Sequence, residues 1–362
     1  MTLALQGVSK VVGSETHIHP TDIELAEGAM TVLLGPTLAG KTSLMRLMAG
    51  LDKPTAGRVI WKGEDVTGLR VQKRGVAMVY QQFINYPSAT VWENIASPLK
   101  LKGLDRGEID RKVRWAADLV RLREDQLERK PLELSGGQQQ RCALARALVK
   151  DAGLVLLDEP LANLDYKLRE ELREEIPKIF AESGAIFVYA TTEPMEALLL
   201  GGWTACLWEG RVTQYGPTPE VYRNPADATT ARVFSDPPMN FATVAKQGAE
   251  ARFGSEAPAR VSGPLATLPD GRYRVGFRPN HLRVAPPEGD AIAFAGRIAI
   301  TEITGSESFI HIDHGGDRWV ALTHGVKHPA VGQEMRLFVD PAHLYVFGED
   351  GRLVAGAPYA AA

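Results

Sequence analysis

Short apolar runs and longer amphipathic stretches alternate along the first 235 residues of the chain. The runs are rich in aliphatic and aromatic residues, as expected of strands buried in a parallel sheet. They lie at residues 30–34, 57–61, 76–80, 154–157 and 186–190. Such an alternation, from Leu3 to about Phe234, predicts an α/β domain in which helices cover both faces of a sheet.

The interval between the third and fourth of these strands has a different pattern. Within residues 106–122 charged residues surround one apolar stripe, as in an amphipathic helix. The apolar positions with helical spacing are Ile109, Val113, Ala116, Leu119 and Val120. We therefore expect a helical lobe, at about residues 82–150, inserted between two strands of the sheet.

After Asp236 the chain changes to short segments of alternating polarity, separated by Gly, Pro, Asp or His. The segments lie at residues 273–277, 293–300, 308–312, 319–322 and 335–339. This pattern predicts a small, barrel-like β domain. The sequence thus divides into a domain at residues 1–235 and a β-rich domain at residues 236–362.

Composition and charge exclude several classes of protein. The net charge is −3 and no long Lys/Arg run occurs, so nucleic acid is not expected as a partner. No stretch approaches the roughly 18 apolar residues of a membrane span, and the N-terminus lacks a leader pattern, which predicts a soluble chain inside the cell. Cys142 and Cys206 are isolated, so neither a zinc site nor a disulfide is expected. Six of the eight histidines fall in the β-rich domain without ligand-like spacing, which favours solvated histidines over a metal site.

A glycine-rich loop follows the strand at residues 30–34. Its sequence is Gly35-Pro36-Thr37-Leu38-Ala39-Gly40-Lys41-Thr42, and Leu44, Leu47, Met48 and Leu51 then have helical spacing. Backbone N–H groups and the positive end of a helix suit a polyphosphate, with Lys41 reaching β/γ oxygens and Thr42 a Mg²⁺ ion. The alternative is a glycine-rich turn with a surface lysine, but strand before and helix after favour a nucleoside triphosphate site.

Two further motifs follow the loop in order: Leu134-Ser135-Gly136-Gly137-Gln138-Gln139-Gln140-Arg141, and an apolar strand ending in Asp158-Glu159-Pro160. Ser135, Gly136 and Gly137 expose a hydroxyl and N–H groups at a helix start, which suits a γ-phosphate. Taken alone, an Asp-Glu pair at a strand end is more often a solvated turn than a catalytic site. In this order, the motifs resemble the ATP-binding subunits of ABC transporters over residues 1 to about 235.

The resemblance implies a P-loop NTPase fold, with ATP and Mg²⁺ as cofactors, and a role for each motif. Asp158 and Gln81 would lie near Mg²⁺ with Thr42, and Glu159 would polarise the attacking water. The remaining nucleotide contacts would come from the loop, Ser43 and Val12. The signature, Ser135 to Gln138, would reach the ATP of a second subunit, and Asp165 matches a loop that crosses the dimer interface.

The β-rich domain indicates which group of ABC transporter subunits the chain resembles. Residues 275–282, Val-Gly-Phe-Arg-Pro-Asn-His-Leu, resemble the start of the oligonucleotide-fold-like domain of carbohydrate-importer ATPases of the maltose and glycerol-phosphate type. Because basic and aromatic residues are not interleaved there, a regulatory or dimer-contact role is favoured over nucleic-acid binding.

Three positions depart from the family pattern. Thr192 follows the strand at residues 186–190, where the family has a histidine that contacts the γ-phosphate, and a short neutral hydroxyl cannot replace imidazole. Leu38 occupies a position that is usually glycine. Val12 stands where an aromatic residue stacks on adenine, although His17 or His19 is a possible substitute. The alternative is that this subfamily uses other residues for the same contacts.

The expected function is that of an ATP-binding and hydrolysing subunit of an importer for a carbohydrate, a polyol such as glycerol, or a glycerol phosphate. Its partners would be a second ATPase subunit, identical or homologous, two membrane permeases and, indirectly, an extracytoplasmic solute-binding protein. The chain would lie at the cytoplasmic face of the inner membrane, with residues 83–91 in a groove for a permease helix or, alternatively, in the lobe core. A rival hypothesis is a catalytically weak subunit that serves mainly its partner's site, with Thr192 impairing its own.

Overall fold

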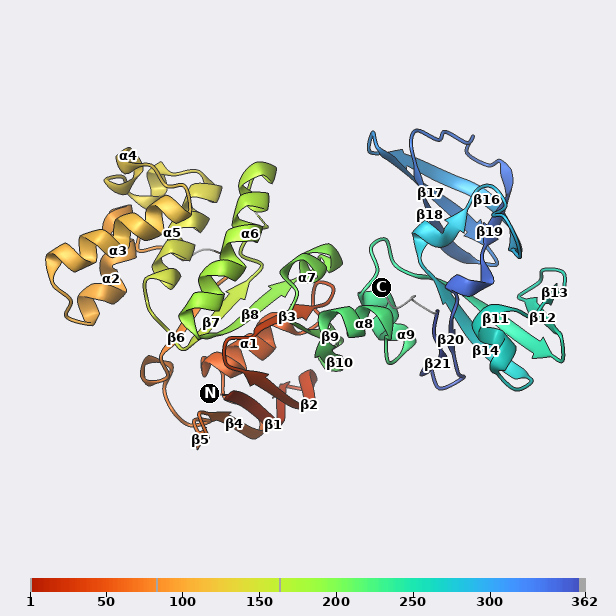
Figure 1. Cartoon of the computed structure of the whole chain (residues 1–362). Helices are drawn as coiled ribbons and strands as arrows, with labels where there is room; N and C mark the ends of the chain where they lie inside the picture. Colours follow the sequence, from red (N-terminus) through yellow and green to blue (C-terminus); the bar gives the residue numbers. More distant parts are fainter. Residues whose placement is uncertain (1, 83, 163, 358–362) are drawn as a thin grey trace. The chain divides into compact units, whose positions relative to one another are not determined.

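The computed structural model describes residues 2–82, 84–162 and 164–357. Its contacts divide the chain into two compact units, Met1–Thr218 and Pro219–Ala362 (Figure 1). This division falls earlier than the boundary at residue 235 expected from the sequence. The reason is that α9 (Ala228–Val233), which follows α8 (Thr218–Arg223), packs Ala228 and Ala231 against Phe241 and Phe347 of the second unit.

The centre of the first unit is a six-stranded sheet in the order β10-β9-β3-β8-β7-β6. Its strands are β3 (Met30–Leu34), β6 (Val76–Val79), β7 (Leu154–Asp158), β8 (Ile186–Thr191), β9 (Trp203–Trp208) and β10 (Arg211–Pro217). All neighbours are parallel except β9 and β10. Since β6 pairs directly with β7, the predicted insertion between two strands of one sheet is confirmed.

A second, antiparallel sheet corrects the prediction of one sheet covered by helices on both faces. It has the order β2-β1-β4-β5 and consists of β1 (Thr2–Val12), β2 (Glu15–Ala26), β4 (Ala56–Trp61) and β5 (Glu64–Asp65). Leu44 and Leu47 of α1 (Lys41–Ala49) share a core with Leu5 of β1 and Leu156 of β7. The helix that follows the glycine-rich loop is therefore packed against both sheets.

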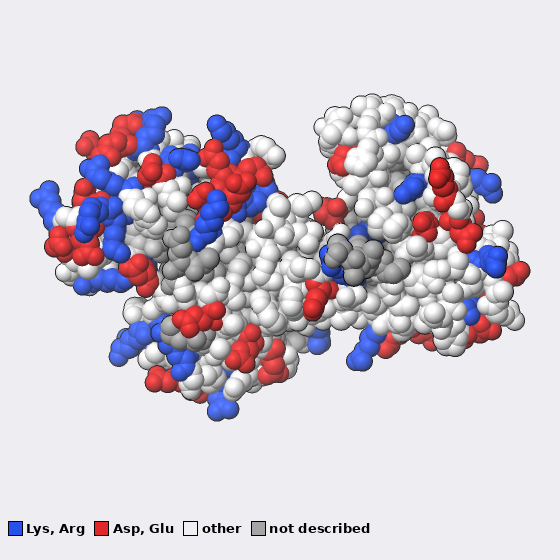
Figure 2. All heavy atoms as spheres, in the orientation of Figure 1, with Lys and Arg blue, Asp and Glu red and all other residues white. Residues whose placement is uncertain are grey.

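The inserted lobe contains α2 (Val91–Leu101), α3 (Arg106–Leu119), α4 (Glu124–Leu127) and α5 (Gly136–Leu148). On α3 the predicted apolar face is confirmed, because Ile109, Val113 and Ala116 are buried. Thr90 caps α2 in a capping box with Glu93, which satisfies N–H groups at the helix start. Figure 2 shows positive and negative side chains intermixed over the lobe on the face in view.

A buried carboxylate connects α7 (Pro194–Leu200), the helix after β8, to β8 and α6 (Tyr166–Ser183). Glu196, on α7, accepts hydrogen bonds from the hydroxyls of Tyr189 (3.1 Å) and Thr191 (2.6 Å). Its other oxygen lies 3.1 Å from Arg173 of α6. Because Glu196 is 5% exposed, its charge depends on these three donors.

We predict that Glu196→Ala lowers the free energy of unfolding of the first unit by about 3–5 kcal/mol, since Arg173 loses a buried counter-charge. The control is Glu170→Ala, which removes a more exposed partner of the same arginine and should cost about 1 kcal/mol or less. Urea unfolding at neutral pH measures both. Equal losses would show that Glu196 is not the main counter-charge of Arg173.

In the second unit, α9 and most of α8 precede two antiparallel sheets, which are the strands predicted for an all-β domain. One has the order β13-β12-β11-β14-β20-β21 and the other β15-β19-β16-β17-β18. The strands of the first sheet are β11 (Asn240–Gln247), β12 (Glu250–Phe253), β13 (Ala259–Arg260), β14 (Gly271–Phe277), β20 (Tyr345–Phe347) and β21 (Leu353–Ala355). The strands of the other are β15 (Leu282–Arg283), β16 (Ile292–Ile303), β17 (Glu307–His314), β18 (Asp317–His324) and β19 (Glu334–Val339). Phe277, Phe294 and Trp319 pack against one another in the core.

The histidines of this unit are not uniformly solvated, which corrects part of the expectation. His324 and His328 are exposed, but the ring of His281 stacks on that of His343 with centroids 4.0 Å apart. Burial lowers the pKa of His281 to about 4, so this ring is neutral near pH 7. No group of three or more potential metal-ligating side chains occurs within the described ranges.

Arg278 joins the end of β14 to the segment around α8. Its guanidinium donates to the carbonyls of Phe234 and Tyr222, both at 2.8 Å, and lies 3.7 Å from the centroid of the Tyr222 ring. Only 4% of Arg278 is exposed. Within the motif at residues 275–282, Arg278 therefore has a structural role: it attaches the end of β14 to the segment around α8.

We predict that Arg278→Met destabilises the second unit by about 2–4 kcal/mol, because buried hydrogen bonds from a charged donor are lost. The control is Arg283→Met, at an exposed arginine of β15, with an expected cost below about 0.5 kcal/mol. Denaturant unfolding of the full chain, followed by near-UV circular dichroism, distinguishes them. An unchanged midpoint in Arg278→Met would contradict the anchoring role.

Candidate functional site

The glycine-rich loop joins β3 to α1 through left-handed backbone positions. Gly40 has φ 102°, and a Cβ there would lie 3.0–3.3 Å from Ile18, Gly210 and the His17 carbonyl, so a side chain at this position would be both strained and crowded. Leu38 also has a positive φ, 68°, and its side chain is 95% exposed. The left-handed backbone explains why glycine is the usual residue at the position that Leu38 occupies.

Lys41 is the buried cation of the site. The residue is 5% exposed, and its Nζ donates to the carbonyls of Gly35 (2.7 Å) and Pro36 (3.1 Å). Nζ also lies 3.5 Å from the Glu159 carboxylate. Burial lowers the pKa of Lys41, and the charge of Glu159 opposes that shift. Lys41 is thus positioned by backbone carbonyls at the loop, where a polyphosphate would offer stronger acceptors.

Oxygen ligands gather where β7 ends. The Thr42 hydroxyl donates to Asp158 at 2.7 Å, and Gln81 Nε2 donates to Glu159 at 2.9 Å. Burial raises the pKa of Asp158, while the hydrogen bond from Thr42 opposes the shift. A hydroxyl, a carboxylate and an amide oxygen are ligands that suit Mg²⁺. The structure brings together four residues predicted from three separate segments of the sequence.

Thr42, Gln81 and Glu159 face a cavity of about 550 Å³, and Asp158 lies behind Thr42. Its lining consists of Glu15, Thr16, His17, residues 37–43, Gln81, Glu159, Glu209 and Gly210. Val12 is absent from this lining and lies half exposed at the end of β1, whereas His17, the alternative named for it, lines the cavity. Lys41, Thr42 and Ser43 therefore share the cavity with a histidine from β2.

Sequence reasoning missed the turn at Glu209 and Gly210. Gly210 donates its N–H to the Ala39 carbonyl (3.0 Å), and its own carbonyl accepts from His19 N–H (2.9 Å). Both turn residues have positive φ. The Glu-Gly pair between two apolar strands is a hairpin signal, but nothing local links that hairpin to the loop at Gly40.

Thr192 is exposed directly after β8, and it does not appear in the lining of the cavity. The preceding residue connects this segment to the loop, because the Thr191 carbonyl accepts from Gly35 N–H at 3.3 Å. The Thr191 hydroxyl accepts from Glu193 N–H and donates to Glu196. The hydrogen bonds of Thr191 and Glu193 thus fix the backbone on both sides of Thr192, next to the loop.

The signature motif lies at the start of α5. Ser135 is the N-cap, its hydroxyl accepts from Gln138 N–H, and the Gln138 side chain accepts from Ser135 N–H at 3.0 Å. Ser135 and Gly136 are exposed, and the motif contributes nothing to the described lining of the cavity. Asp165, also exposed, caps α6 by accepting from Leu168 N–H (3.1 Å). Both motifs thus present a helix start outside this chain's own cavity.

The segment expected to receive a permease helix lies at residues 83–91, of which residue 83 falls outside the described residues. Ile84 and Tyr86 are 58% and 53% exposed, which contradicts the alternative of a lobe core for these two side chains. Asn94 holds the segment by accepting from Tyr86 N–H and donating to the Tyr86, Ala89 and Thr90 carbonyls. Sequence reasoning missed this buried asparagine.

Comparisons with known proteins extend over nearly the whole chain. Residues 18–162 match the ABC transporter family and residues 275–347 the TOBE domain family. The sn-glycerol-3-phosphate import ATP-binding protein UgpC of Cupriavidus pinatubonensis is 35% identical, over 95% of this chain and 96% of that protein. The alpha-glucoside transport ATP-binding protein AglK of Rhizobium meliloti is 34% identical, over 97% and 98%.

A solved structure matches the first unit. The ATP-binding cassette MJ0796, a dimer in a post-hydrolysis state bound to ADP and Pi, is 29% identical and has a TM-score of 0.56. The match covers 60% of this chain and 98% of that one. None of the helices formed by the described residues is long and apolar enough to cross a membrane. The motifs, their geometry and the near full-length relatives lead to one conclusion: the chain belongs to the family of ATP-binding subunits of ABC transporters.

Proposed function

We propose that this chain hydrolyses ATP to drive the import of a glycerol phosphate, a carbohydrate or a polyol through two membrane permeases. One observation carries the proposal: Lys41, Thr42, Gln81 and Glu159 line one cavity, and Asp158 accepts a hydrogen bond from Thr42 at its wall. The names of the relatives, which specify sn-glycerol-3-phosphate and alpha-glucoside, support this class of solute. The chain would work at the cytoplasmic face of the inner membrane. An extracytoplasmic solute-binding protein would deliver the solute to the permeases.

In this proposal the chain's own residues bind the triphosphate and orient water. Lys41 exchanges the carbonyls of Gly35 and Pro36 for β/γ-phosphate oxygens. Thr42, Asp158 and Gln81 would hold Mg²⁺, and a bound Mg²⁺ would neutralise charge on the phosphates. The Glu159 carboxylate accepts a hydrogen bond from Gln81 and forms an ion pair with Lys41. In this position it would polarise the attacking water.

A second ATPase subunit would complete each site. The exposed signature at Ser135 to Gln138 and the exposed Asp165 favour a head-to-tail dimer, in which each signature serves the partner's ATP. Identical or homologous subunits both satisfy this geometry. Ile84 and Tyr86, exposed on a rigidly held segment, support a permease-docking surface.

A second candidate is a catalytically weak subunit that serves mainly its partner's site. Thr192 favours it, because a threonine at the place of the γ-phosphate histidine removes a transition-state contact. Loss of one such contact costs about 10²–10³ in rate. In a heterodimer, Thr192, Lys41 and Glu159 would belong to one site, while Ser135 would serve the other.

The experiment that tests the proposal is equilibrium binding of ATP to Lys41→Ala. We predict affinity at least about 100-fold weaker, because a desolvated triphosphate loses the loop's cation, equivalent to roughly 3 kcal/mol. Lys178→Ala is the control, since Lys178 is largely exposed and pairs only with Glu175 in the described structure. Unchanged ATP affinity in Lys41→Ala would overturn the assignment of the loop.

The two candidates differ in which mutation stops the assembled transporter. If this chain's own site is weak, Ser135→Arg should reduce transport-coupled ATP hydrolysis at least about tenfold more than Glu159→Gln, and Thr192→His should remain active. Steady-state ATPase of the complex with its native partner measures all three variants. Equal damage from Ser135→Arg and Glu159→Gln would mean that both sites hydrolyse ATP, which contradicts the weak-subunit hypothesis.

A further inference from the structure

The outer face of the six-stranded sheet in the second unit carries three arginines on neighbouring strands. In the strand register, Arg252 of β12 and Arg272 of β14 both pair with Ala245 of β11, and Arg274 of β14 pairs with Thr243. Cross-strand partners point to the same face of a sheet. The opposite face is the core, where Val244 and Val275 are buried. The three guanidinium groups therefore belong to one surface.

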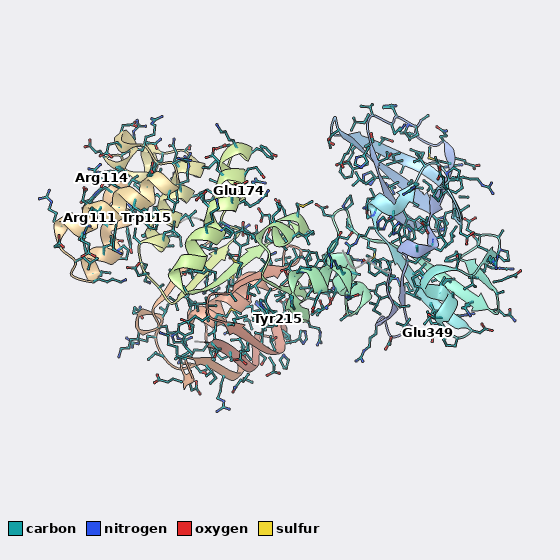
Figure 3. All side chains as sticks on the ribbon, viewed as in Figure 1. Arg111, Arg114, Trp115, Glu174, Tyr215 and Glu349 are labelled. Carbon is teal, nitrogen blue, oxygen red and sulfur yellow. The ribbon has the colours of Figure 1, made fainter. Side chains whose placement is uncertain are left out.

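This surface is hollowed into a cavity of about 450 Å³. Besides the three arginines, its lining includes Thr243, Ala245, Gly254, Gly348 and Gly351, all of them small. Glu349, labelled in Figure 3, is the acidic residue of the lining. Small residues beneath long basic side chains give a concave floor with a positive rim.

None of the three arginines forms a close ion pair among the described residues, although Asp317 lies near enough to Arg274 to act on its charge. No Asp or Glu oxygen of the described residues lies within 4.0 Å of a guanidinium nitrogen of Arg252, Arg272 or Arg274. Arg318, by contrast, pairs with Asp313 at 2.7 Å. Arg274 is held in place instead, 4.2 Å above the Phe241 ring. Arg232 lies 5.4 Å from the same ring, so a fourth positive charge is near.

Partial burial and the neighbouring Arg232 lower the pKa of Arg274, and Asp317 opposes that shift; the guanidinium keeps its positive charge at neutral pH. A bound anion would relieve this repulsion. Planar guanidinium forks match the oxygens of a phosphate group and bind it through paired hydrogen bonds. The Thr243 hydroxyl adds a further donor at the floor.

We propose that this hollow is a binding site for a small phosphate monoester or inorganic phosphate, with the phosphate group held between Arg252, Arg272 and Arg274. The site lies in the second unit and shares no residue with the ATP cavity of the first. Its ligand would therefore be an effector and not the hydrolysed nucleotide. The inference does not depend on which solute is imported.

The test is isothermal titration calorimetry of the full chain with sn-glycerol 3-phosphate, inorganic phosphate and uncharged glycerol. We expect both phosphates to bind, more weakly as KCl is raised, and glycerol not to bind. Arg272→Gln combined with Arg274→Gln should weaken the binding of both at least tenfold. Arg260→Gln, at an exposed arginine of the same sheet outside the hollow, should leave it unchanged.

Binding through the ATP loop is excluded by repeating the titration with Lys41→Ala, where the phosphate affinity should persist. Loss of phosphate binding in Lys41→Ala would overturn the inference, because the anion would then occupy the nucleotide loop. The inference would also be overturned if the double arginine variant bound phosphate as tightly as the unmodified chain. The same holds if neither phosphate compound bound to the unmodified chain. Since all three arginines are exposed side chains, thermal unfolding of the variants should match that of the unmodified chain.

Discussion

The nucleotide site depends on one buried positive charge. The Lys41 ammonium is removed from water, so it must find acceptors, and it finds two backbone carbonyls of its own loop and the Glu159 carboxylate. Glu159 in turn accepts from Gln81, and Asp158 accepts from Thr42. One buried cation thereby couples the loop after β3 with the end of β7 and the segment after β6.

Backbone geometry gives this arrangement its rigidity. Gly40, Leu38 and Glu159 all have left-handed φ, which is costly for residues other than glycine, so the surrounding packing must maintain it. The antiparallel sheet and the hairpin at Gly210 supply that packing, because both contact the loop around Gly40.

The two faces of the six-stranded sheet in the second unit differ in the side chains that they carry. One face of the six-stranded sheet contributes Phe253 and Phe277 to the apolar core, and the other carries arginines over small residues. Such alternation follows from the two-residue period of a strand. Arginines that form no close ion pair add little stability to the fold, and this is the physical ground for the proposed anion site.

The sequence by itself determined the features that depend on neighbours along the chain. The loop from Gly35 to Thr42, the strand before it and the cap at Ser135 were all predictable, because hydrogen bonds and periodicity there span a few residues. The oxygen ligands at Asp158 and Gln81 were inferred through a family resemblance. Local patterns did not distinguish the antiparallel sheet from the parallel one, since both contain short apolar runs.

Only the tertiary structure decided which distant side chains meet. Thr42 and Asp158 are 116 positions apart, and Gln81 and Glu159 are 78 apart, so their hydrogen bonds leave no periodic signal. The same holds for Glu196 with Arg173 and for the arginines of the hollow, whose alignment depends on strand register. Contacts of this kind follow from how sheets and helices pack, and packing is set by the whole core and not by any one segment.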